Sequence, residues 1–228
     1  MTIDRHEHFK IKIAVSGAAD TGHLPEEALT LAKEIGSEIV RQGAVLVTGA
    51  TTGIPFWSAK GAKEAGGVSI GISPAKDEKD HVESYHLPID YMDIIMYTGQ
   101  GYSGRDILMT RTSDAVIECA GRIGTIHEFT VVFEDNKPLG VLEGPWETDD
   151  LIREIIKKSH REEDNKKIVY DSDPKRLVAK VIELVQKDKI EYYKIPTEGG
   201  FSRICDGPKC LPTHTVKPEQ SGNPAKIN

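Results

Sequence analysis

Residues 121–128 (GRIGTIHE) combine a glycine turn, a hydroxyl and a carboxyl group at spacings that suit a sugar phosphate. Gly124 and Thr125 stand where we expect a helix to begin, so free backbone N–H groups and a hydroxyl would face a bound phosphate. Glu128 follows Thr125 by three residues, which places both side chains on one helical face. A carboxylate is unfavourable beside a phosphate unless it contacts another part of the ligand, such as ribose hydroxyls. The alternative is a structural glutamate that the helix dipole stabilises.

Two earlier glycine turns, residues 16–22 (SGAADTG) and 48–54 (TGATTGI), each precede a predicted helix. Small residues at such turns let backbone N–H groups approach an anion closely. We therefore expect phosphate contacts at Gly17, Gly49, Thr51 and Gly53. An ordinary strand-to-helix loop would have the same composition. Neither turn reads G-x-G-x-x-G, which argues against NAD binding of the usual kind.

Arg105 stands at the start of a helix that we predict over residues 105–112. A positive charge is unfavourable at a helix N-terminus, which suggests that Arg105 is there for a ligand. At the end of a strand it could reach the same crevice as Glu128. The alternative is a surface salt bridge.

Strand-like and helix-like segments alternate from residue 11 to about residue 189, and this alternation predicts the frame that positions these turns. Short apolar runs predict strands, and apolar residues at helical spacing follow most of them. Such units favour an α/β fold with a Rossmann-like parallel sheet of about seven strands and helices on both faces. Ligands of these sheets bind outside the carboxyl ends of the strands, where the glycine turns fall. The predicted strands are residues 11–16, 44–48, 68–72, 93–97, 115–119, 139–142 and 167–170.

Residues 190–228 differ from the rest, with five of the twelve prolines, few aliphatic residues and no periodicity. We predict a domain over residues 1–189 and an extended or poorly ordered C-terminal tail over residues 190–228. Cys205, Cys210 and His214 in this tail offer only three zinc ligands at unusual spacing, so a zinc site there is disfavoured. Cys119 ends an apolar run and is expected to be a buried free thiol.

Composition and residue spacing argue against several classes of function. The formal net charge of −7 argues against a nucleic-acid-binding surface, although it does not exclude one small phosphate. No apolar run is long enough to cross a membrane, and residues 1–10 do not resemble a signal peptide, so we expect a cytoplasmic protein. His23, His81, His86 and His127 lack ligand spacing, which disfavours a metal enzyme. No lysine stands in a context that suggests a pyridoxal phosphate Schiff base, and we expect no cofactor.

Three motifs together resemble the LONELY GUY family, which belongs to the wider SLOG group of Rossmann-like nucleotide binders. They are residues 48–55 (TGATTGIP), 103–115 (SGRDILMTRTSDA) and 120–129 (AGRIGTIHEF). The resemblance covers about residues 11–142. It implies a homodimer or higher homo-oligomer that hydrolyses the N-glycosidic bond of a nucleoside 5′-monophosphate to free base and ribose 5-phosphate. Arg105 and Glu128 match the family's catalytic pair, and its phosphate loop matches Gly121, Gly124 and Thr125, with Gly49 and Gly53 on the opposite side.

The residues suit this chemistry. Departure of the base leaves positive charge on the ribose, which a Glu128 carboxylate would stabilise while it orients water. Arg105 would anchor the substrate or stabilise the leaving base, and the helix N-terminus would hold the phosphate in place.

The motifs also depart from the enzyme pattern. Arg122 replaces a glycine of the phosphate loop, Ala120 replaces a proline, and His127 stands where the enzymes often have glutamate. Arg122 could add a phosphate contact or crowd the turn. SLOG relatives that bind without hydrolysis, such as molybdenum-cofactor carrier proteins, have a similar loop. A non-catalytic carrier or sensor of a nucleotide or molybdenum-cofactor-like ligand is therefore the alternative function.

Overall fold

The computed structural model of this protein describes residues 10–194. Seven strands, all paired in parallel, form one sheet in the order β4-β3-β2-β1-β5-β6-β7. The predicted Rossmann-like parallel sheet is thus confirmed. The strands are β1 (Lys12–Gly17), β2 (Val45–Thr48), β3 (Ser69–Ser73), β4 (Ile94–Tyr97), β5 (Ala115–Cys119), β6 (Leu139–Leu142) and β7 (Ile168–Asp171).

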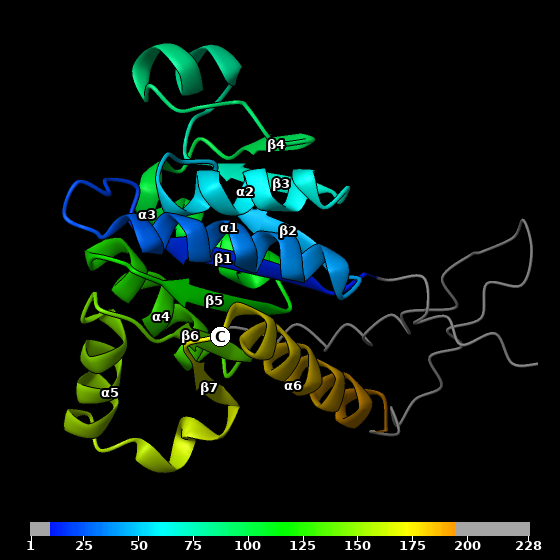
Figure 1. The fold of residues 1–228 in the computed structure, drawn as a ribbon, viewed down its shortest axis with the longest axis vertical. Coiled ribbons are helices and arrows are strands. Elements are labelled where there is room, and N and C mark those ends of the chain that lie inside the picture. Colours follow the sequence, from blue (N-terminus) through cyan, green and yellow to red (C-terminus); the bar gives the residue numbers. More distant parts are fainter. Residues whose placement is uncertain (1–9, 195–228) are drawn as a thin grey trace, which may run out of the picture. The chain divides into compact units, whose positions relative to one another are not determined.

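Helices cover both faces of the sheet, as the continuous apolar strands predict. Ile13 of β1 packs in the core beneath α1, α2 and α6, whereas the adjacent Ala14 packs in the core beneath α3, α4 and α5. Figure 1 shows α1, α2 and α6 on the near side of the sheet. The helices are α1 (Glu26–Arg41), α2 (Ile54–Glu64), α3 (Gly101–Thr112), α4 (Ile123–Glu134), α5 (Thr148–Lys158) and α6 (Pro174–Lys194), with a π-helical turn at Asp80–Ser84 and a 3-10 turn at Glu162–Lys167.

The strand order reverses around β1, which lies between β2 and β5. In an open parallel sheet this reversal opens a crevice at the carboxyl ends of the strands. The turns after β1, β2 and β5 are the three glycine turns identified in the sequence. The fold therefore brings them to the same edge of the sheet.

Two helix starts differ from the predicted ones. Helix α3 begins at Gly101, so Arg105 lies in its second turn and the argument from an unfavourable helix dipole is wrong. The glycines of residues 101–104 favour a turn locally, but tertiary packing overrides this weak preference. Thr148 is the first residue of α5 rather than its cap, and its hydroxyl instead bonds the backbone N–H and C=O of Gly121, each at 2.9 Å.

Helix α6 begins as predicted, since the Asp173 carboxylate accepts a bond from the Arg176 N–H at 2.8 Å. The helix continues to Lys194, five residues into the segment that we expected to be irregular. The rest of the predicted tail, with Cys205, Cys210 and His214, lies outside the described residues. Cys119 is a buried free thiol, as predicted.

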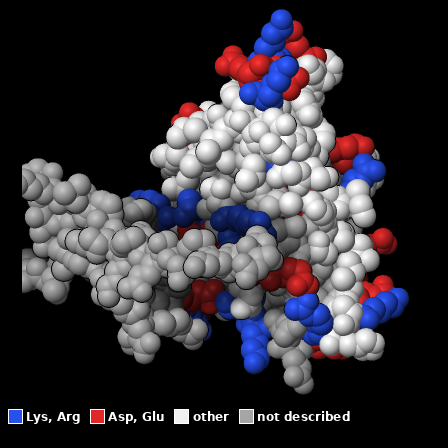
Figure 2. Space-filling model, turned by 180° about the vertical axis from the view of Figure 1, so that it is seen from behind, with Lys and Arg blue, Asp and Glu red and all other residues white. Residues whose placement is uncertain are grey.

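Charged residues are unevenly spread over the surface. Figure 2 shows the side opposite to the view of Figure 1, where charged side chains gather at the top, right and bottom, basic side chains lie near the middle, and a broad area above these is uncharged. No helix within residues 10–194 is long and apolar enough to span a membrane. A cytoplasmic location stays a prediction.

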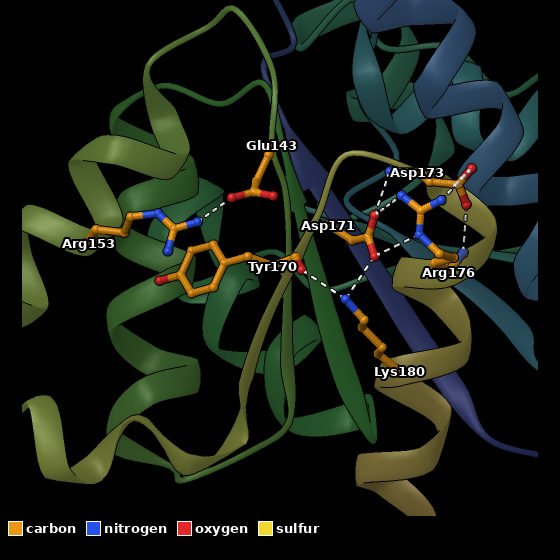
Figure 3. Close-up of polar contacts among 7 residues, drawn as sticks. All are labelled: Glu143, Arg153, Tyr170, Asp171, Asp173, Arg176 and Lys180. Atoms are coloured by element: carbon orange, nitrogen blue, oxygen red, sulfur yellow. Dashed lines mark hydrogen bonds and ion pairs between the residues drawn. The ribbon is translucent and has the colours of Figure 1, made fainter.

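An ion cluster joins the end of β7 to α6 (Figure 3). The Asp171 carboxylate, whose side chain is 7% exposed, accepts bonds from Arg176 at 2.7 Å and Lys180 at 2.8 Å. These two cations hold the pKa of Asp171 well below its usual value. The cluster therefore stabilises the fold above the ordinary aspartate pKa of about 3.9, and this stabilisation is lost as the pH falls towards the folded pKa.

We expect Asp171→Ala to lower the free energy of unfolding by about 1 to 2 kcal/mol at pH 7, because two cations and the Asp173 N–H lose their acceptor. The loss should be smaller at about pH 3, because the unfolded carboxyl is largely protonated there whereas the folded carboxyl, with its lowered pKa, resists protonation. Urea unfolding at both pH values measures it. Glu183→Ala, which removes an exposed ion pair with Lys187, is the control and should leave stability almost unchanged. Equal losses in the two variants would contradict a special role for Asp171.

Candidate functional site

A cavity of about 290 Å³ lies at the carboxyl ends of β1, β2 and β5. Residues from all three glycine turns and from α3 and α4 line it. The structure thus brings together most of the residues that the sequence singled out. Those lining the cavity are Gly17, Gly49, Thr51, Arg105, Arg122, Gly124, Thr125 and Glu128.

Gly53 and Gly121 do not line this cavity but shape the turns around it. Gly53 has a φ of 69°, and an added Cβ would lie 2.2 Å from the Ala18 carbonyl oxygen. Only glycine suits this conformation and this close approach. Gly121 is bonded to the Thr148 hydroxyl, which ties the α4 turn to α5.

The guanidinium of Arg105 lies directly over Gly49. A Cβ added to Gly49 would be 1.4 Å from Nη1 of Arg105, so the missing side chain makes the space for the cation. The Arg105 side chain is 7% exposed, and its Nε has no hydrogen-bond partner in the described part of the chain. Its one ion pair there is with Asp106, Nε to Oδ1, at 3.1 Å. A buried guanidinium that lines a cavity is suited to an anion.

The N-terminus of α4 adds to this positive potential. No side chain caps it, and its first turn contains no acidic residue. The first bond of the helix runs from the Ile126 N–H to the Arg122 carbonyl oxygen at 3.1 Å. The backbone N–H groups of residues 123–125 therefore have no partner within the helix. Gly124 and Thr125 line the cavity, so these donors lie at its wall.

Glu128, one turn further along α4, also lines the cavity and is buried. The Ser16 hydroxyl donates a hydrogen bond to its Oε2 and lies 3.3 Å from the Thr125 hydroxyl. Burial raises the pKa of Glu128 to about 8, which Arg105 opposes and Asp106 reinforces. Glu128 is thus mostly neutral at pH 7. This removes the repulsion that a carboxylate would exert on a phosphate, and it makes Glu128 a hydrogen-bond donor.

Sequence reasoning missed Ser16 and Glu118, which pair across β1 and β5. Glu118 is 1% exposed, and its carboxyl oxygens form no well-aligned hydrogen bond among residues 10–194, although the neighbouring Ser16 hydroxyl lowers its pKa. Burial raises its pKa well above the usual value, and the nearby Glu128 adds to this. The available signal was a glutamate inside the apolar strand AVIEC, where an ionised side chain is costly.

Asp106 and His127 were also missed as site residues. The Asp106 carboxylate accepts a bond at 2.9 Å from Nδ1 of His127 through Oδ2, while its Oδ1 pairs with Arg105. Asp106 is 7% exposed at its side chain and lines the cavity, whereas the His127 side chain is 41% exposed. The sequence did not indicate that Asp106 of α3 bonds His127 of α4, because this contact depends on how the two helices pack.

Arg122 lies at the mouth of the cavity, where its Nη1 is 3.1 Å from Oδ2 of Asp20. Both side chains are exposed. They also line a larger open groove of about 920 Å³ that runs along the start of α5 and includes Trp146, Thr148 and Glu154. The cavity and the groove therefore meet at this ion pair.

The fold and the cavity define a class of protein, a Rossmann-like α/β protein with a pocket where the strand order reverses. The chain belongs to the SLOG cluster4 family, whose sequence profile matches residues 10–178. This confirms the predicted membership of the SLOG group.

One similar protein and two similar solved structures are consistent with this family assignment. An uncharacterised protein of Archaeoglobus fulgidus is 32% identical over 135 residues, which are 59% of this chain and 83% of that protein. The molybdenum cofactor binding protein of Rippkaea orientalis is 28% identical with a TM-score of 0.63, covering 80% of this chain and 99% of that one. The molybdenum cofactor carrier protein of Chlamydomonas reinhardtii is 28% identical with a TM-score of 0.61, covering 78% and 99%.

We expect Glu118→Leu to raise the free energy of unfolding by about 1 to 3 kcal/mol at pH 8, because it removes a buried carboxyl that has no well-aligned hydrogen bond. The raised pKa means that stability falls as the pH rises above the ordinary glutamate value of about 4.3. The variant should therefore lose less stability than wild type between pH 5 and pH 8. Urea unfolding measures both effects, with Glu154→Leu at an exposed position as the control. A less stable Glu118→Leu variant would indicate that the carboxyl has a partner.

Proposed function

We propose that this protein binds a phosphate-bearing small molecule, of nucleotide or molybdenum-cofactor type, and acts as its carrier or sensor. The observation that carries the proposal is the buried Arg105 guanidinium, which lies over Gly49 and lines the cavity. Two relatives with 28% identity are named for binding or carrying molybdenum cofactor, a molecule that contains a pterin and a phosphate.

The phosphate would lie between Arg105 and the N-terminus of α4. The N–H groups of residues 123–125 and the Thr125 hydroxyl would bind its oxygens from one side, and Arg105 from the other. Neutral Glu128 would donate a hydrogen bond to the phosphate or to a sugar or ring atom next to it.

The rest of the ligand would extend towards the mouth of the cavity. A volume of about 290 Å³ is at the lower limit of pockets for drug-sized ligands. The larger groove beyond Arg122 and Asp20 offers the remaining space. Arg122, which replaces a glycine of the enzyme pattern, would exchange Asp20 for an anionic group of the ligand.

Hydrolysis of a nucleoside 5′-monophosphate is the second candidate function, because Arg105 and Glu128 line the same cavity. Stabilisation of a ribosyl cation requires an ionised Glu128. With a pKa of about 8, the free protein holds little of that form at pH 7. The enzyme hypothesis therefore predicts activity that rises with pH towards about 8, whereas binding to a neutral Glu128 weakens over the same range.

Two further features remain part of the proposal. The family resemblance implies a homodimer or higher oligomer, and α3 and α4 expose the large apolar side chains Tyr102, Leu108 and Ile123, which suit a contact between copies. A cytoplasmic location agrees with a carrier of a small phosphorylated molecule.

The test is native mass spectrometry for a retained ligand, followed by calorimetric titration with a panel of nucleoside 5′-monophosphates and phosphorylated pterins. Arg105→Ala should weaken binding at least about tenfold, because it removes a charge-assisted contact. Arg111→Ala, on the same helix but paired with Asp135 at the surface, is the control and should bind as wild type does.

Chromatography of the same mixtures separates the two functions. Binding without free base supports a carrier or sensor. Release of free base that is abolished by both Arg105→Ala and Glu128→Gln would establish the enzyme instead. Absence of any retained ligand and of any binding would contradict both.

A further inference from the structure

A buried carboxylate joins the cation of the cavity to an exposed imidazole. Asp106 contacts Nε of Arg105 at 3.1 Å through one oxygen and Nδ1 of His127 at 2.9 Å through the other. The side chains of Arg105 and Asp106 are each 7% exposed, whereas that of His127 is 41% exposed. Protons from solvent can therefore reach the imidazole without opening the cavity.

Asp106 weakens the attraction of Arg105 for a bound anion. A carboxylate beside the guanidinium offsets its charge, and attraction between them is strong because both are shielded from water. An anionic ligand that binds Arg105 must work against this carboxylate, which also lines the cavity. A second cation beside Asp106 would reduce the repulsion between Asp106 and the ligand. A protonated His127, which contacts Asp106, would be that cation.

The other charged and titratable groups around Asp106 are few. Arg105 belongs to α3, Glu128 and His127 to α4, and Glu118 to β5. Burial raises the pKa of both glutamates, to about 8 for Glu128, which favours their neutral forms. Histidine is the side chain that ordinarily changes charge in the range from pH 5 to pH 8.

We propose that His127 and Asp106 set the anion affinity of Arg105, as a proton-dependent control of the ligand site. When His127 is protonated, it becomes a second counter-ion of Asp106. Asp106 then offsets less of the Arg105 charge, and Arg105 attracts the ligand more strongly. Neutral His127 leaves Arg105 paired with Asp106, and the anion binds more weakly. A ligand would thus be taken up at lower pH and released at higher pH. This inference rests on the proposed anion binding at Arg105.

Sulfate is the probe, because its charge does not change over the relevant range, unlike that of a phosphate monoester. Calorimetric titration at constant ionic strength from about pH 5.5 to about pH 7 stays below the pKa of about 8 of Glu128. We expect the wild-type affinity to fall on the order of five- to tenfold over this range. His127→Gln should bind weakly at every pH, and Asp106→Asn should bind tightly at every pH.

His23→Gln is the matched control, since His23 is exposed and lines the neighbouring groove. It should keep the wild-type pH dependence. A pH-independent wild type, or an Asp106→Asn variant that binds more weakly than wild type, would overturn the inference and make Asp106 a mere support for Arg105. His127→Gln changes an exposed residue, so the test does not depend on the folding of Asp106→Asn.

Arg105→Ala distinguishes this failure from failure of the proposed function. If wild type binds sulfate and Arg105→Ala does not, the proposed anion site at Arg105 is supported, even when His127→Gln overturns the proton-dependent control. If Arg105→Ala binds sulfate as wild type does, the anion site is elsewhere and both proposals fall.

Discussion

The burial of one guanidinium determines the chemistry of the whole site. Arg105 is held out of water over Gly49, and a buried charge is unfavourable unless it is compensated. Asp106 supplies part of that compensation, and burial raises the pKa of Glu128 and Glu118, which favours their neutral forms. The cavity wall thus combines the buried Arg105 cation with the Asp106 carboxylate and the Glu128 carboxyl group, and Arg122 and Asp20 form an exposed ion pair at its mouth. That balance favours a bound anion over a cation or a metal ion.

The fold makes this arrangement possible by placing three strand ends together. Ser16 of β1 and Glu118 of β5 are in register, and Ser16 reaches Glu128 on α4 through its hydroxyl. Helix α3 brings Arg105 across the end of β2, where a glycine leaves room. Each contact depends on the parallel sheet reversing its strand order at β1.

The sequence predicted the sheet and the position of the glycine turns well, because apolar periodicity and glycines at strand ends are local signals. It did not predict that α3 begins at Gly101, since packing there overrides local preference. It also missed Asp106, Glu118 and His127 as parts of the site. Their roles depend on which helices meet and on how deeply each carboxyl is buried. The neutral state of Glu128 has the same origin, and it moves the functional assignment from hydrolysis towards binding.

The most direct test of the anion site is the space over Gly49. Gly49→Ala should retain the fold but displace Arg105, because the added methyl group would occupy the position of Nη1. Gly22→Ala, where an added Cβ meets only an ordinary 3.5 Å contact, is the matched control. The account predicts that calorimetric sulfate affinity falls about tenfold in Gly49→Ala and is unchanged in Gly22→Ala. Wild-type affinity in a folded Gly49→Ala protein would contradict it.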